Sequence, residues 1–206
     1  MFVAIVPAYN EEKRIGSVVQ SLFEHVDRVV VVDDASVDNT SPEARKAGAA
    51  LETVHAYARE VGADFVLHFD GDAQFDVGDI KPALERLKKE GADILFGSRF
   101  LGVDSNMPWF KKNILSPVGR MVNNFFGAVR VSDAHNGFRI LNKKALGNIQ
   151  ITQDRMAHAT EILTLTKQKG LKHTEFPVKV TYHEYGQRAS NGFHIIKDLV
   201  FGKFIK

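Results

Sequence analysis

The sequence predicts an α/β fold, with a Rossmann-like, mainly parallel sheet flanked by helices. Three observations favour it. The strands expected at 2–6, 29–32 and 64–69 contain apolar runs, at 2–6, 29–32 and 65–67, that are continuous rather than alternating, as in strands buried on both faces. Segments with helical spacing of apolar residues separate these runs. The chain has 206 residues, of which 44% are hydrophobic and 25% charged, which fits one globular domain.

The elements of the first half follow in order. The strand at 2–6 is ended by Pro7, and a helix is expected over 11–25, with Ile15, Val18, Val19 and Leu22 on one face. After the strand at 29–32, Ser41 is the expected N-cap of a helix over 42–61 that Gly62 ends. The strand at 64–69, a helix over 79–90 ended by Gly91 and a strand at 93–96 complete this half.

The second half is less regular. We expect a loop at 98–110, a helix at 117–126, a short strand at 137–141, a helix at 157–169, an extended segment at 173–183 and a final helix at 193–204. No repeat or linker divides the chain. We therefore predict a single domain over 1–206, with an N-terminal half (1–97), a C-terminal half (98–190) and an amphipathic tail (191–206).

Composition excludes several functions. The chain has no cysteine, so disulfides, thiolate metal sites and thiol nucleophiles are impossible. The formal net charge is +2 with no dense Lys/Arg block, which argues against nucleic acid as a partner. The first residues lack the pattern of a signal peptide, and no apolar run is long enough to span a membrane. We expect a cytoplasmic protein.

Polar clusters follow three of the expected strands: PAYNEE at 7–12, DDAS at 33–36 and DGDAQFD at 70–76. The carboxyl ends of parallel strands meet at one edge of the sheet, where ligands bind. Carboxylates gathered there repel one another unless a cation intervenes. A magnesium or manganese ion held by Asp70 and Asp72, and shared with a substrate diphosphate, fits this pattern. Neither GxxxxGK[ST] nor GxGxxG is present to bind phosphate instead.

These motifs carry a resemblance. In order, VAIVPAYNEEKRI, VVVVDDASVDNT, DGDAQFD, GSRF and VSDAHNGFRILNKKAL resemble a family-2 glycosyltransferase of the GT-A fold, in the group of dolichol-phosphate mannose synthases and polyprenyl-phosphate glucosyltransferases. The resemblance runs from residue 2 to about residue 188. It implies metal-dependent, inverting transfer of a sugar from a UDP- or GDP-linked donor to a polyprenyl phosphate. Two alternatives stay open: a glycan or protein hydroxyl as acceptor, and a non-catalytic nucleotide-sugar-binding module.

The resemblance also implies roles for individual residues. Those expected to contact the nucleotide are Pro7, Ala8, Tyr9, Glu11 and Asp34. Asp72 is expected to bind the metal, Asp70 the metal or the ribose, and Gln74 to lie near both metal and diphosphate. The residues expected near phosphates are Arg99, Arg139 and Arg188, of which Arg188 would neutralise the leaving group. His183 is a possible third metal ligand, and a hydroxyl acceptor would need Glu161 or Asp133 as a base.

Two further expectations concern the membrane and the sheet. Residues 109–126 and the tail at 191–206 combine apolar and basic side chains, as in helices that lie at a membrane surface. A peripheral protein at the cytoplasmic face of a membrane would reach a lipid acceptor in this way. The segment from Asp34 to Asp70 is shorter than the resemblance leads us to expect. We therefore expect one edge strand of the nucleotide-binding half to be missing, leaving the pocket less enclosed.

Overall fold

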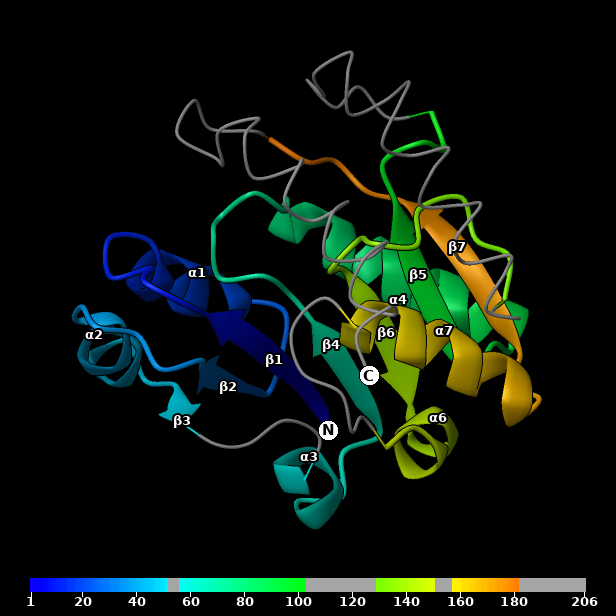
Figure 1. Cartoon of the computed structure of the whole chain (residues 1–206), viewed down its shortest axis with the longest axis horizontal. Coiled ribbons are helices and arrows are strands. Elements are labelled where there is room, and N and C mark those ends of the chain that lie inside the picture. Colours follow the sequence, from blue (N-terminus) through cyan, green and yellow to red (C-terminus); the bar gives the residue numbers. More distant parts are fainter. Residues whose placement is uncertain (52–55, 103–128, 151–156, 182–206) are drawn as a thin grey trace, which may run out of the picture.

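The structure is a computed structural model that describes residues 1–51, 56–102, 129–150 and 157–181 (Figure 1). Its strands are β1 (Phe2–Ala8), β2 (Arg28–Asp33), β3 (Ala50–Leu51), β4 (Phe65–His68), β5 (Ile94–Ser98), β6 (Arg139–Asn142) and β7 (His173–Pro177). Within the described residues they form one seven-stranded sheet in the order β3-β2-β1-β4-β6-β5-β7. The α/β class and the mainly parallel sheet expected from the sequence are confirmed.

The sheet is parallel except at β6, which runs antiparallel to both of its neighbours, β4 and β5. Ile140 pairs with Leu67 on one side and with Leu95 on the other. The reversed direction places the start of β6, at Arg139, beside His68 at the carboxyl end of β4. A segment from the second half of the chain therefore reaches the edge where the acidic cluster of β4 lies.

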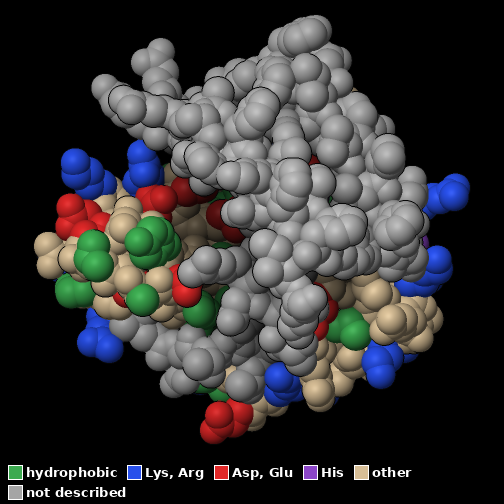
Figure 2. Space-filling view, viewed as in Figure 1, with side chains coloured by type: hydrophobic (Ala, Val, Ile, Leu, Met, Phe, Trp, Pro, Cys, Tyr) green, Lys and Arg blue, Asp and Glu red, His purple; other side chains and the backbone are tan. Residues whose placement is uncertain are grey.

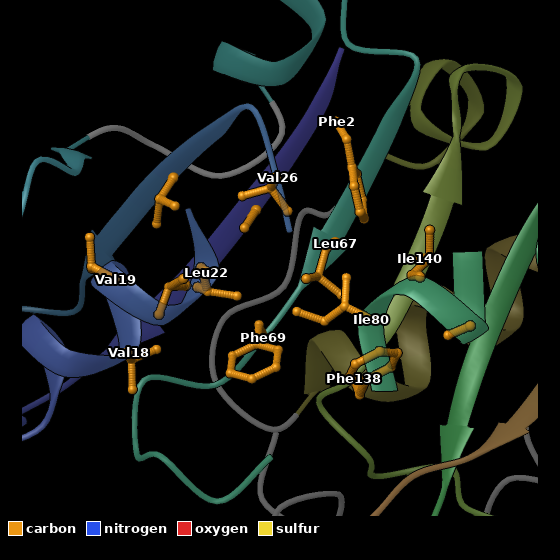
Figure 3. Packing of buried hydrophobic residues seen from close by; sticks show 14 of the residues in the cluster. Phe2, Val18, Val19, Leu22, Val26, Leu67, Phe69, Ile80, Phe138 and Ile140 are labelled. Atoms are coloured by element: carbon orange, nitrogen blue, oxygen red, sulfur yellow. The ribbon is translucent and has the colours of Figure 1, made fainter. Parts of the chain in front are cut away.

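Helices cover both faces of the sheet (Figure 1). They are α1 (Ile15–Leu22), α2 (Thr40–Lys46), α3 (Ala56–Glu60), α4 (Ile80–Glu90), α6 (Lys143–Asn148) and α7 (Ala157–Gln168), and a 3-10 turn, η1 (Val77–Asp79), precedes α4. α1 and α4 pack on one face, where Leu22 and Ile80 meet Leu67, Phe69 and Phe138 (Figure 3). α3, α6 and α7 contribute to the core on the other face. None of the helices in the described ranges is long and apolar enough to cross a bilayer.

Local signals explain where the helices begin and end. The four apolar positions expected on one face of α1 are all buried. The helix begins at Ile15 rather than at residue 11, because the preceding residues belong to a loop that bonds to the segment after β2. Gly91 ends α4 with a left-handed φ of 57°, as its position in the sequence indicated.

The expected helix over 42–61 and the expected loss of an edge strand are both wrong. α2 ends at Lys46, and Gly48 turns the chain with a φ of 99°, a conformation that favours glycine. β3 then pairs in parallel with β2, Ala50 opposite Val30 and Leu51 opposite Val31. The chain next enters α3. The edge strand is thus present but short, because two residues are enough to continue the ladder at an edge.

Several expected features lie outside the described residues: the helices at 117–126 and 193–204, most of the loop at 98–110, and the amphipathic tail at 191–206. The division into a single domain with two halves and a tail stays a prediction. The extended segment at 173–183 is described up to residue 181. It contains β7, and beyond β7 Val180 forms an antiparallel bridge with Phe75 in the loop after β4.

Candidate active site

The loops that follow β1, β2 and β4 are joined at the carboxyl-end edge of the sheet. The backbone N–H of Asp34 donates to the carbonyl of Ala8 (3.0 Å), and that of Gly71 donates to the carbonyl of Pro7 (3.2 Å). Acidic side chains are visible on this part of the surface in Figure 2, which has the same direction of view as Figure 1. The three polar clusters singled out in the sequence therefore lie together, as the parallel sheet required.

Each of these loops contains one strained residue. Asn10, Ala35 and Ala73 have φ of 56°, 63° and 60°, and they are the non-glycine residues with positive φ in the described ranges. A non-glycine residue in this conformation costs about 1–3 kcal/mol and persists where surrounding contacts impose it. Such strain concentrates at functional sites. Its presence in all three loops, and nowhere else among the described residues, marks this edge independently of charge.

The residues expected around the nucleotide lie on the first loop with different exposure. Ala8 is buried, Pro7 is exposed, and Tyr9 has 58% of its surface exposed. The carboxylate of Glu11 accepts a hydrogen bond from Arg14 at 2.8 Å, and its backbone N–H donates to Thr40. Pro7 and Tyr9 can therefore contact a ligand at this edge, whereas Ala8 and Glu11 chiefly hold the loop.

The two aspartates of the second loop have different roles. Asp33 accepts hydrogen bonds from the backbone of Ser36 (2.9 Å) and from the hydroxyl of Ser41. Burial raises the pKa of Asp33, but these hydrogen bonds outweigh it and bring the pKa below the ordinary value. Asp34 is exposed at the rim. Asp33 organises the loop, and Asp34 is the carboxylate available to a nucleotide.

The three aspartates of the third loop, Asp70, Asp72 and Asp76, also differ in their surroundings. Asp76 caps η1 by accepting from the backbone N–H of Gly78 (2.9 Å), so its position is explained locally. Asp72 accepts from the backbone N–H of Gln74 (3.1 Å). Burial and the neighbouring Asp72 raise the pKa of Asp70 to about 6. Asp70 and Asp72 thus form the pair whose charge is poorly compensated.

Two glycines allow this packing. A Cβ atom on Gly71 would lie 3.1 Å from the carbonyl oxygen of Pro7, so glycine lets the first and third loops approach. A Cβ atom on Gly137, two residues before β6, would overlap the carboxylate of Asp70. The carboxylate therefore lies directly against the backbone of the NGFR segment (136–139). The close neighbour of Gly71 is thus the backbone of Pro7.

Arg139 also lies at this edge of the sheet, beside His68 at the end of β4, and it is 3% exposed. Burial lowers its pKa to about 10, while the charges of Asp70 and Asp133 oppose that change. Its Nε is buried and has no hydrogen-bond partner among the described residues. A buried donor of this kind normally has a partner. An oxygen of an anionic ligand is one group that would satisfy it.

Arg99 follows β5 and forms an ion pair with Asp133. Its Nε lies 2.6 Å from Oδ2 of Asp133, and its Nη2 lies 2.8 Å from Oδ1. Arg99 also opposes the rise in the pKa of Asp70, so it is close enough to act on the acidic pair. Asp133 had been considered as a base for a hydroxyl acceptor. Both of its oxygens already accept hydrogen bonds from Arg99, which disfavours that role.

The remaining site predictions are placed only in part. Glu161 lies half-buried in α7, and its role as a base stays a prediction. His183 and Arg188 lie outside the described residues. The described residues contain no group of three or more His, Cys, Asp or Glu that could hold a metal. Asp70 and Asp72 are the two carboxylates that we consider as metal ligands at this edge of the sheet.

A groove lies elsewhere in the molecule. With a volume of about 710 Å³, it is lined in part by Phe2, Phe65, Leu87 and Lys88. These residues surround the amino ends of β1 and β4, at the edge of the sheet opposite to Asp70. The site is therefore assigned from the charges and the loop geometry at the carboxyl ends of the strands, rather than from a cavity.

The family model for glycosyl transferase family 2 matches residues 3–150, which include all three loops, Arg99 and the NGFR segment. The chain belongs to glycosyl transferase family 2. It is a glycosyltransferase, and the family expected from the sequence motifs is confirmed. This membership accounts for the conjunction of acidic loops and arginines at one edge of the sheet.

Relatives and solved structures agree with this family membership. The chain is 30% identical to the UDP-N-acetylglucosamine–dolichyl-phosphate N-acetylglucosaminyltransferase of Methanococcus voltae, over 98% of this chain and 96% of that protein. It is 23% identical to the undecaprenyl-phosphate mannosyltransferase of Micrococcus luteus, over 92% and 87%. The glucosyl-3-phosphoglycerate synthase of Mycobacterium tuberculosis, crystallised with Mg²⁺ and UDP, superposes with a TM-score of 0.67 at 16% identity, over 98% of this chain and 78% of that one. That likeness shows the GT-A glycosyltransferase fold.

Proposed function

We propose that this glycosyltransferase moves a sugar from a nucleoside-diphosphate donor to a polyprenyl phosphate, with inversion at the anomeric carbon and with Mg²⁺ or Mn²⁺. The observation that carries the proposal is the Asp70–Asp72 pair, set at the carboxyl-end edge of a family-2 fold. The acceptors named for two relatives, dolichyl phosphate and undecaprenyl phosphate, support a lipid phosphate as the acceptor.

The residues of this edge fit a hard divalent cation. Asp70 and Asp72 offer carboxylate oxygens, the ligands that Mg²⁺ prefers. Burial and the neighbouring Asp72 raise the pKa of Asp70, which supports a cation beside the pair, because positive charge would favour the ionised carboxylate. A magnesium ion commonly keeps only one or two protein carboxylates and completes its shell with water and substrate phosphates. When bound, it would offset the negative charge of the nucleoside diphosphate as that group departs.

The protein's own residues would then orient the two substrates. In the reaction, a phosphate oxygen of the acceptor forms the new bond to the anomeric carbon, and the bond from that carbon to the donor's diphosphate oxygen breaks. The electron pair leaves with the diphosphate. Tyr9 and Asp34 would contact the nucleotide, and Arg139 and Arg188 would bind phosphate oxygens. An arginine fork matches such oxygens.

A phosphate acceptor also fits the state of Asp133. A phosphate oxygen is already anionic at neutral pH, so it needs no strong base to attack. A hydroxyl acceptor would need one, and Asp133 is engaged with Arg99 through both oxygens. This observation removes one of the two candidate bases for a glycan or protein hydroxyl, the other being Glu161, and in that way supports a polyprenyl phosphate.

The acceptor class implies contact with a membrane surface. We infer a peripheral association, for which residues 109–126 and 191–206 are the segments of suitable composition. Action at the cytoplasmic face stays a prediction.

The test is thermal unfolding of the purified chain with a panel of UDP- and GDP-sugars, each with Mg²⁺, with Mn²⁺ and with chelator. A donor at a hundred times its Kd stabilises the folded state by about 2.7 kcal/mol, which raises the Tm of a chain of this size by about 5–10 °C. We expect a metal-dependent rise for one nucleotide. Sugar transfer is then measured with a short prenyl phosphate and with the prenyl alcohol of the same length.

The variant pair Asp72→Asn and Asp76→Asn provides the control. Both substitutions remove a carboxylate from the same loop, but Asp76 caps η1. Asp72→Asn should abolish the metal-dependent rise, whereas Asp76→Asn should keep it with little change in the basal Tm, because asparagine caps a helix about as well as aspartate. Transfer to the alcohol but not to the phosphate would refute the proposed acceptor. Absence of any donor effect in a cooperatively unfolding chain would refute the donor.

A further inference from the structure

The ion pair between Arg99 and Asp133 has a fixed geometry. Two parallel contacts, 2.6 and 2.8 Å, join the guanidinium edge of Arg99 to both oxygens of Asp133, and the backbone N–H of Arg99 donates to Oδ2 at 3.1 Å. A bidentate contact of this kind sets the plane of the guanidinium as well as its position. Asp133 therefore determines where the charge of Arg99 points.

The two partners differ in exposure. The side chain of Asp133 is 3% exposed and that of Arg99 is 22% exposed. The carboxylate is thus buried behind the guanidinium, and the cation is the member of the pair that solvent or a ligand reaches. A carboxylate in this position is poorly placed to take a proton from an incoming hydroxyl.

A hydrogen bond from Asn136 also fixes the position of Asp133. The side-chain amide of Asn136 donates to Oδ2 of Asp133 (3.2 Å), and its oxygen accepts from the backbone N–H of Phe138 (2.9 Å). Phe138 is fully buried. The position of Asp133 is therefore fixed by the same segment that brings Gly137 against Asp70.

A second set of contacts fixes the backbone on both sides of the pair. Ser132 donates to Glu175 through its N–H (2.7 Å) and its hydroxyl (2.5 Å). The hydroxyls of Ser132 and Ser98 lie 2.6 Å apart, and the backbone N–H of Phe100 donates to the hydroxyl of Ser98. The residues next to Asp133 and next to Arg99 are thus joined to each other. Burying charges is costly, and contacts of this kind are what hold a buried ion pair in one geometry.

We propose that Asp133 is a positioning residue that orients the guanidinium of Arg99 to bind the phosphate of the acceptor. The inference rests on the proposed function for the identity of the acceptor. It assigns Asp133 a task other than proton transfer. It also predicts that the two residues act as one unit, because both oxygens of Asp133 accept hydrogen bonds from Arg99.

A double-mutant cycle tests this unit. The variants are Arg99→Ala, Asp133→Asn and the double variant, measured for binding of farnesyl phosphate by thermal shift and for transfer kinetics. Arg99→Ala should weaken farnesyl phosphate binding and raise the acceptor KM about 10- to 100-fold, the range for loss of a charge-assisted hydrogen bond. Asp133→Asn should have a smaller effect of the same kind. The double variant should match Arg99→Ala within about twofold in acceptor binding, in acceptor KM and in the pH profile.

Asp93→Asn is the matched structural control. Asp93 is similarly buried and accepts from Lys144, Asn142 and the backbone of Lys172, but at the opposite edge of the sheet. It should lower the Tm without changing acceptor binding. Arg99→Lys is the second test, in case Asp133→Asn fails to fold. It keeps the charge and loses the fork, so acceptor binding should weaken, and parental binding in this variant would overturn the inference.

The outcomes separate this inference from the proposed function. If the effects of Asp133→Asn and Arg99→Ala multiply, or if Asp133→Asn removes the acidic limb of the pH profile, Asp133 acts independently and the inference is wrong. If the parental chain transfers no sugar but binds farnesyl phosphate with the coupling described, the inference holds and the proposed reaction is wrong. If the parental chain does not bind farnesyl phosphate at all, the inference is overturned.

Discussion

The substitution Gly137→Ala separates the position of Asp70 from its chemistry. An alanine Cβ would overlap the carboxylate of Asp70. Gly137 is not among the glycines with positive φ, so its backbone accepts alanine and the effect comes from the overlap alone. Relieving such overpacking costs about 1–3 kcal/mol, which lowers the Tm of a chain of this size by about 2–12 °C.

The effect on activity should exceed the effect on stability. Asp70 must rotate away from the added methyl group, which displaces one member of the acidic pair. A displacement of about 1 Å in a site of this kind costs roughly 100-fold in kcat/KM. We expect that loss in sugar transfer, together with a weaker Mg²⁺-dependent rise in Tm in the presence of donor. Both are measured at a temperature where the variant is fully folded.

Gly147→Ala is the control for this experiment. Gly147 lies in α6, and a Cβ atom there would meet no atom within 4 Å. Alanine should stabilise the helix by up to about 1 kcal/mol and leave transfer unchanged. If Gly137→Ala retains parental transfer and the parental metal response, the carboxylate of Asp70 does not need the position described here, and the reasoning is refuted.

Two further predictions concern pH and the core behind the site. The folded pKa of Asp70 is about 6 against an ordinary 3.8, so without metal the folded state binds more protons in this interval and its stability should fall as the pH rises from about 4 to about 6. Urea unfolding should show this slope in the parental chain; an unchanged slope in Asp70→Asn would contradict the assignment. Phe138 packs its ring 6.2 Å from Phe69 and 5.9 Å from Phe75, so Phe138→Ala should cost about 3–5 kcal/mol. A loss below about 1 kcal/mol, measured by denaturant titration, would mean that this core relaxes freely.

Much of the fold was predictable because buried parallel strands produce an unambiguous pattern. β1, β2 and β4 are continuous apolar runs, each followed by polar residues, and a parallel sheet must bring those residues to one edge. The core face of α1 was readable from its helical spacing. Gly91 was readable as a helix end, because few other residues adopt its left-handed conformation.

The parts that could not be predicted depend on pairings rather than on patterns. β3 has two ladder residues within an alanine-rich segment, too few to produce a period, so its sequence was indistinguishable from a helix. A short strand was expected at 137–141, where β6 lies over Arg139–Asn142, but nothing local indicates that it runs antiparallel between β4 and β5. Asp133 and Arg99 are 34 positions apart, so the sequence displays two charges without their contact. The reason for a glycine at position 137 becomes visible only in the structure, where the carboxylate of Asp70 lies against its backbone.

The insertion of β6 between β4 and β5 has a consequence for the synthesis of the protein. Both neighbours emerge from the ribosome before residue 139, so their facing edges stay unpaired while about 40 further residues are added, as counted from the end of β5. Unpaired strand edges attract other chains. We expect the N-terminal half to be unable to complete its sheet by itself. A chain cut after residue 98 should therefore be handled by chaperones or aggregate.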